Sequence, residues 1–83
     1  MTKIQNINSA FPLPMAGEGD RVKIVSLNGG SNFRTRLRGM GLNSGSEIEI
    51  IQNSFGGKML IAFEGTRLFL GGGMAQRIDV III

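Results

Sequence analysis

Short segments in which apolar residues alternate with other residues recur along this chain, and tight turns separate them. Successive side chains of a β-strand point to opposite faces, so alternation places the apolar residues on one face. The pattern occurs in residues 21–27, 47–52, 58–63, 66–70 and 77–83. A chain of 83 residues has room for one domain, so these strands share one core. We therefore predict a mostly β, largely antiparallel barrel of about five strands, whose closure hides the sheet edges.

Residues 33–40 have helical periodicity instead. Phe33, Leu37 and Met40 recur at spacings of four and three residues, which aligns them as one apolar stripe on a helix. The segment lies between the first two predicted strands. It predicts one short α-helix there.

The residues that follow this helix are typical of an abrupt stop. Gly41 is placed to adopt the left-handed conformation that commonly ends a helix, and Leu42 can then fold back on the last turn in a Schellman arrangement. Gly45 is expected to make the next reversal, into the strand at residues 47–52. Leu37, Met40, Gly41, Leu42 and Gly45 are thus expected to form one structural motif.

The N-terminal region differs from the rest in composition. Residues 1–10 are polar and aperiodic, so we expect a flexible tail followed by one domain over residues 11–83. Residues 1–15 do not resemble a signal peptide. No window approaches the roughly 20 apolar residues of a membrane helix. We expect a cytoplasmic protein without direct membrane insertion, associated with a membrane only through a partner.

The missing residue types restrict the chemistry. The chain has no His, Cys, Trp or Tyr. Zinc, copper and iron sites depend on imidazole or thiolate ligands, and acid–base catalysis near neutral pH depends most often on His. Glu47 and Glu49 share a strand face, but we interpret them as solvated because no third ligand is evident. We expect no catalytic residues, no cofactor and no metal site, and hence no enzyme.

Three segments resemble FeoA domains. The run Arg36-Leu37-Arg38-Gly39-Met40-Gly41-Leu42-Asn43-Ser44-Gly45-Ser46-Glu47-Ile48-Glu49-Ile50 is similar to the segment typical of that family. Residues 65–70, followed by Ala75-Gln76-Arg77-Ile78, resemble the second half, and residues 13–19 resemble its opening. The resemblance covers residues 13–80. The chain departs from the family at Gly39, where a better helix former is usual.

The resemblance implies an SH3-like fold and a function in ferrous iron uptake. It implies a small cytosolic adaptor that binds and modulates the membrane ferrous-iron transporter carrying a G-protein domain. A second hypothesis is an SH3-like interaction module related to the C-terminal domain of iron-dependent repressors. The pI of about 10.2 raises a third, a small RNA-binding barrel. We expect no nucleic-acid partner, because bases stack on exposed aromatic side chains. The only aromatic residues here are five Phe, and most of them lie at positions that face the predicted core.

Arg34, Arg36 and Arg38 are the first candidate partner-binding residues. Arginine is enriched among the hot-spot residues of protein–protein interfaces, so these three arginines can form a docking surface. The alternative is a solvated flank of the helix whose long side chains cover apolar surface. On a helical wheel, Arg34 and Arg38 flank one side of the apolar stripe and Arg36 flanks the other.

Ile81 and Ile83, near the C-terminus, are the second candidates. They can pair with another strand, in a homodimer through the C-terminal strand or on the partner. The alternative is that Ile82 completes the core and its two neighbours are incidental.

Overall fold

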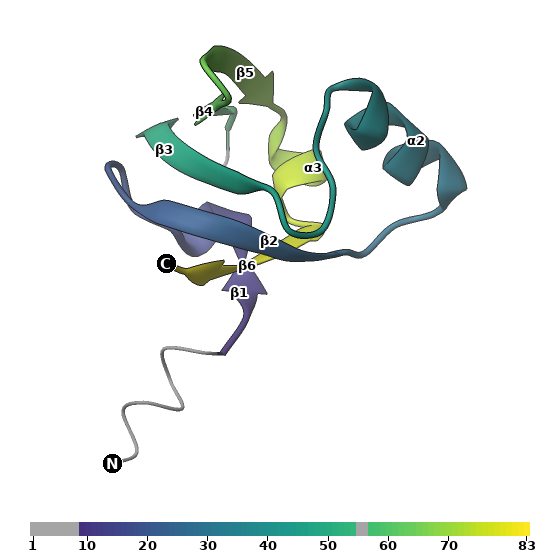
Figure 1. Cartoon of the computed structure of the whole chain (residues 1–83), viewed down its shortest axis with the longest axis horizontal. Helices are drawn as coiled ribbons and strands as arrows, with labels where there is room; N and C mark the ends of the chain where they lie inside the picture. The colour runs from purple at the N-terminus through teal and green to yellow at the C-terminus, as the bar shows by residue number, and fades with distance from the viewer. Residues whose placement is uncertain (1–8, 55–56) are drawn as a thin grey trace.

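The computed structural model describes residues 9–54 and 57–83. In chain order the elements are β1 (Phe11–Pro12), the 3-10 helix η1 (Leu13–Met15), β2 (Arg21–Leu27), α2 (Ser31–Gly39), β3 (Glu47–Asn53), β4 (Met59–Phe63), β5 (Thr66–Leu70), α3 (Gly72–Ala75) and β6 (Ile78–Ile82). Figure 1 labels the strands and the α-helices. Most of the predicted tail, residues 1–8, lies outside the described residues, as do residues 55 and 56 of the loop between β3 and β4.

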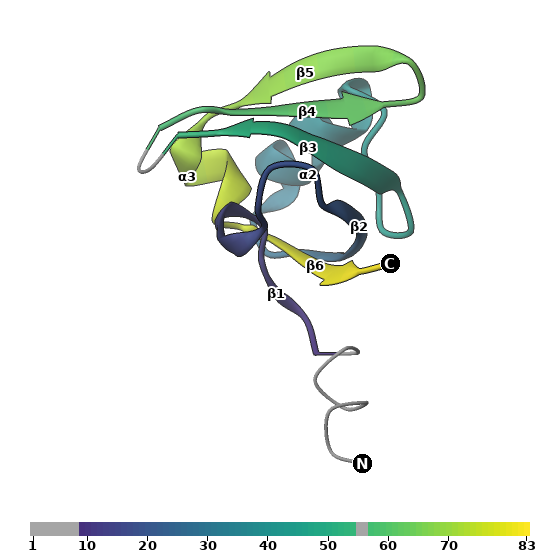
Figure 2. The same ribbon diagram turned by 90° about the vertical axis from the view of Figure 1, so that its left-hand side faces the viewer.

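The strands form one antiparallel sheet in the order β1-β6-β2-β3-β4-β5. The prediction of a five-stranded closed barrel is therefore wrong in both respects. Over the described residues the sheet has six strands, and β1 and β5 remain its two edges. The sheet instead bends strongly, so that β3, β4 and β5 lie across the molecule from β2 and β6 (Figure 2).

The additional strand was missed because it is only two residues long. Phe11 pairs with Val80 and Pro12 with Asp79, and two residues cannot display an alternating pattern. A proline is tolerated here because β1 is an edge strand. With β1 counted, α2 lies between the second and third strands, and not between the first and second as predicted.

The core confirms the predicted inward faces of the strands. Val22 and Ile24 of β2 are fully buried, whereas Val25 is exposed. The other fully buried strand residues are Ile48, Ile50, Met59, Ile61, Leu70, Ile78 and Val80. Leu13, Leu37 and Ala75, one from each helical element, are also fully buried. The helical elements thus pack into the same core as the strands.

The predicted helix and its end are confirmed, with a shift of the bounds. Helix α2 spans Ser31–Gly39 and has Met40 as its C-cap, so it begins two residues and ends one residue before the predicted limits. Gly41 has a φ of 92°. Its N–H donates to the Arg38 carbonyl at 2.9 Å, and the Leu42 N–H donates to the Leu37 carbonyl at 2.9 Å. These two hydrogen bonds form the Schellman motif predicted from the sequence.

The turn after the helix attaches to β2. Gly45 has a φ of 96°, as its predicted reversal requires. Its N–H donates to the Ile24 carbonyl at 2.7 Å, and the Ile24 N–H donates to the Ser46 carbonyl at 2.8 Å. The segment leaving α2 is therefore held against the middle of β2, and the helix is held beside that strand.

Replacing Gly39 by alanine is expected to raise the free energy of unfolding by about 0.5–1 kcal/mol, because alanine restricts the unfolded chain more than glycine does. Gly39 lies within α2 without a positive φ, and a Cβ there meets nothing within 4 Å. Urea denaturation followed by circular dichroism measures the change. Gly29→Ala is the control and should be destabilising, because its Cβ would collide with the ring of Phe33. A lower midpoint for Gly39→Ala would contradict the prediction.

Candidate functional site

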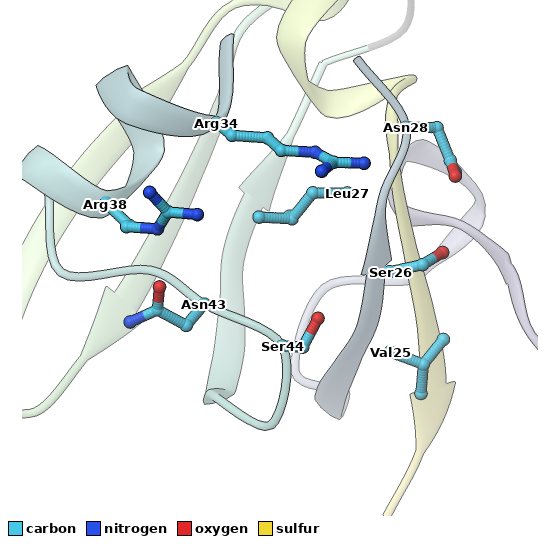
Figure 3. Close-up of a pocket in the computed structure, with 8 residues that line it drawn as sticks. All are labelled: Val25, Ser26, Leu27, Asn28, Arg34, Arg38, Asn43 and Ser44. Carbon is cyan, nitrogen blue, oxygen red and sulfur yellow. The ribbon is translucent and has the colours of Figure 1, made fainter. Parts of the chain in front are cut away.

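A groove of about 470 Å³ runs between helix α2 and the C-terminal half of strand β2 (Figure 3). Three segments line it: β2 and the residue after it, one face of α2, and the loop that follows the helix. The lining residues are Val25, Ser26, Leu27, Asn28, Arg34, Arg38, Asn43 and Ser44. The groove thus brings together segments that lie up to 19 residues apart in the sequence (Val25 to Ser44).

Two of the three predicted arginines meet in this groove. Arg34 and Arg38 lie one helical turn apart, and both guanidinium groups reach from α2 toward β2 (Figure 3). Both residues are exposed. Within residues 9–54 and 57–83, neither guanidinium makes an ion pair or a hydrogen bond. The two positive charges are therefore available to an anionic ligand.

Arg36 lies on the other side of the helix. It lines a separate hollow of about 450 Å³ together with Phe33, Met74, Arg77 and three small or polar residues. The structure therefore divides the predicted arginine surface into two, as the helical wheel indicated, and only the Arg34 and Arg38 side faces β2. Docking by any of the three arginines remains a prediction.

The opposite wall of the groove is the part of β2 that β3 does not cover. Strands β2 and β3 pair from Arg21 to Lys23 only. The register between β2 and β6 shifts between Ile24 and Ser26, which is the sign of a β-bulge. After this bulge the half-buried Leu27 points toward α2, while Ser26 and Asn28 point away from it (Figure 3).

The polar side chains of this wall are held by β6. Asn28 Nδ2 donates to Asp79 Oδ2 at 2.7 Å, and Ser26 Oγ donates to the same oxygen at 3.3 Å. Asp79 does not line the groove. Its carboxylate therefore fixes the end of β2 without neutralising the arginines across the groove.

The other predicted site residues, Ile81 and Ile83, do not line the groove. Ile81 is half-buried and pairs with Lys23 of β2, and the Ile83 N–H donates to the Arg21 carbonyl at 3.1 Å. Ile81 lies in β6, and Ile83 directly follows this strand. Strand β6 is an inner strand, although β1 covers it only at Asp79 and Val80. A homodimer through this strand remains a prediction.

The alternative interpretation of the C-terminus, in which Ile82 completes the core, is wrong. The Ile82 side chain is 41% exposed, so it does not complete the core. The core in this strand ends at Val80, which is fully buried. The last three isoleucines therefore leave apolar surface at the end of β6.

The described residues offer recognition groups and no assembled metal site. In residues 9–54 and 57–83, no three His, Cys, Asp or Glu side chains gather closely enough to hold a metal ion. Glu47 and Glu49 lie on β3, the first exposed and the second half-buried. No helix in the same part of the chain has the length and apolarity needed to cross a membrane. The two guanidinium groups of the groove, which are unpaired within the described ranges, suit noncovalent binding of carboxylates or phosphates.

Sequence reasoning found the arginines but missed Leu27, Asn43 and Ser44 as their neighbours. The end of the helix at Gly41 could have indicated these neighbours. A chain that reverses its direction at that residue returns along the strand that precedes the helix. That signal predicts proximity of the loop to β2. It does not predict which β2 side chain faces the helix, since that depends on the bulge.

Comparison with known proteins gives concordant results from sequence and structure. Residues 11–82 match the FeoA domain family. Over 70 residues the chain is 34% identical to Fe(2+) transport protein A of Methanocaldococcus jannaschii, and the match covers 84% of each chain. A crystal structure of an iron uptake regulatory protein, FeoA, superposes with a TM-score of 0.84 at 33% identity, over 90% of this chain and all of the other.

The fold also occurs within a larger protein. A manganese-dependent transcriptional repressor superposes with a TM-score of 0.82 at 20% identity, over 89% of this chain but only 42% of the repressor. At that identity the likeness concerns the fold alone. The family match spans nearly all described residues, and from it we conclude that this chain belongs to the FeoA domain family, whose relatives are associated with iron(II) transport.

Proposed function

We propose that this protein is a cytoplasmic adaptor of ferrous iron uptake. It binds the cytoplasmic part of the membrane ferrous-iron transporter that carries a G-protein domain, and it modulates that transporter. It acts by binding, without catalysis and without holding iron itself. The observation that carries the proposal is the groove with two arginines that find no partner among the described residues, in a chain whose family is associated with iron(II) transport.

Membership of the family supports the transport context. The relative that is 34% identical is named for Fe(2+) transport, and the match covers 84% of that protein. The Arg34 and Arg38 side chains supply charged donors of the kind that recognise acidic groups on another protein. The residue types present support binding as the mode of action, because the chain has neither His nor Cys.

The purified cytoplasmic domain of the transporter provides the direct test. Isothermal titration calorimetry with this chain is expected to show a complex at micromolar concentrations. The titration is run without nucleotide, with GDP and with a non-hydrolysable GTP analogue, because a modulator that acts on the nucleotide cycle binds these states unequally. Absence of binding at micromolar concentrations in all three states would reject the adaptor function.

The second candidate function is an interaction module that acts on a metal-dependent repressor. The structural likeness to part of a manganese-dependent repressor favours it, although that likeness concerns the fold only. The same titration with a repressor lacking its C-terminal domain separates the two functions. Binding to the repressor but not to the transporter domain would favour the module.

A further inference from the structure

Helix α2 has an unusual charge pattern for an exposed surface helix. Its nine residues include three arginines and no acidic residue. Arg34 and Arg38 lie four residues apart on one face, where like charges repel each other. Among residues 9–54 and 57–83, no carboxylate lines the groove that they face. A ligand that supplies negative charge there would remove this repulsion.

The strand side of the groove offers backbone groups as well. The Asn28 N–H donates to the Arg77 carbonyl, on the β6 side. Peptide groups of an antiparallel strand alternate between its two sides, so those of Leu27 face the groove. Strand β3 pairs with β2 no further than Lys23 and leaves this position uncovered. An extended segment can therefore lie along β2 and pair with it.

The spacing of the arginines fits such a segment. Residues four apart on a helix are separated by about 6 Å along its axis. Alternate residues of an extended strand project from one face about 6.5–7 Å apart. Two acidic residues separated by one other residue can thus reach Arg34 and Arg38 together, while the backbone between them contacts Leu27.

We propose that the groove between α2 and β2 binds an extended acidic segment of the partner protein. Carboxylates two residues apart pair with Arg34 and Arg38, and the backbone of the segment adds to the edge of β2 at Leu27. This inference rests on the proposed adaptor function and places the acidic segment on the cytoplasmic part of the transporter. A nucleic acid is disfavoured because, in the part of the chain that the structure describes, no aromatic ring lines the groove to stack a base.

The test uses a fluorescein-labelled peptide that carries Glu-Val-Glu between Gly-Ser flanks, with a Gln-Val-Gln peptide as the uncharged control. Fluorescence anisotropy is expected to show binding of the acidic peptide only, and binding should weaken as salt is added. In the double variant Arg34→Glu/Arg38→Glu, affinity should fall about 100-fold, roughly tenfold for each lost charged hydrogen-bonded pair.

Arg36→Glu/Arg67→Glu is the matched control. It makes the same change in net charge, from +3 to −1, since each replacement removes one positive and adds one negative charge. Arg36 and Arg67 are exposed, and neither lines the groove. Affinity for the acidic peptide should fall less than about fivefold, because only long-range attraction is lost. Equal losses in the two double variants would overturn the proposal.

Circular dichroism establishes that each variant is folded. If Arg34→Glu/Arg38→Glu does not fold, Arg34→Gln/Arg38→Gln removes the charges while keeping long polar side chains, and it should still lose at least about tenfold. Inorganic phosphate and a single-stranded RNA are titrated in parallel. Binding of either with the same arginine dependence, together with no binding of the Glu-Val-Glu peptide, would overturn the acidic-segment proposal.

Measuring the same variants against the transporter's cytoplasmic domain separates the two proposals. Binding that is unchanged in Arg34→Glu/Arg38→Glu leaves the adaptor function intact and overturns the groove as its site. Arginine-dependent binding of the peptide, with no binding of the transporter domain, supports the groove and rejects the adaptor function.

Discussion

Replacing Leu37 by alanine is expected to lower the free energy of unfolding by about 2–5 kcal/mol. Leu37 is fully buried, and together with Phe33 it packs α2 against the core. A nine-residue helix is marginal on its own, and α2 has no side-chain cap at its N-terminus. Its stability therefore depends on this contact. For a domain whose total stability is about 5–15 kcal/mol, the loss is a large fraction.

Urea denaturation monitored by far-UV circular dichroism gives the free energy directly. Thr35→Ala is the control, because Thr35 lies in the same helix and is exposed. Its effect should stay within about 0.5 kcal/mol. A decrease in the free energy of unfolding below about 1 kcal/mol for Leu37→Ala would contradict the prediction, because it would be close to the effect of about 0.5 kcal/mol that replacements of surface residues have. Leu37 would then not be the residue that holds α2 on the core.

Replacing Gly41 by valine is expected to destabilise the fold by about 1–3 kcal/mol through backbone strain. Gly41 has a φ of 92°, a conformation that a β-branched residue strongly disfavours. A Cβ at this position would also lie 3.2 Å from Cε2 of Phe63, closer than ordinary packing allows. Both effects act on the residue that ends α2.

Thermal and urea denaturation of Gly41→Val measure this effect. Gly41→Asn is the control, because it places the same Cβ against Phe63 but tolerates a left-handed backbone better. It should lose less stability than Gly41→Val. An unfolding midpoint unchanged by valine would contradict the position of the helix end.

Both replacements also bear on the groove. Leu37 and Gly41 stabilise the folded state, in which Arg34 and Arg38 line the groove. Below their unfolding midpoints, the variants should still bind the acidic peptide, with an affinity reduced by the unfolded fraction. The arginine variants should instead lose affinity without losing stability.

Much of the fold could be predicted from local patterns. The bounds of β2 and β5 agree with the predicted segments, and those of β3, β4 and β6 agree within one residue at each end. The inward residues follow from alternation, because burial on one side of a strand imposes it. The extra strand β1 and the open sheet were not predictable in this way, since pairing of Phe11 with Val80 depends on residues far along the chain.

Asn53 illustrates a contact that no local pattern indicates. Its Nδ2 donates to the carbonyls of Pro14 and Ala16, each at 2.9 Å, and its N–H donates to Glu18 Oε2 at 3.0 Å. One residue at the end of β3 therefore fixes the segment between β1 and β2. An asparagine before a loop is ordinary in sequence, and only the bend of the sheet brings these groups together.

By itself, the sequence determined which faces are apolar, where the helix stops and which side of it each arginine occupies. These features depend on side-chain periodicity and on backbone preferences of single residues, which act within about four positions. Only the tertiary structure decided that Arg34 and Arg38 face Leu27 across a groove and that Arg36 does not. That arrangement depends on a bulge in β2 and on the point where β3 leaves it, both set by packing between distant segments.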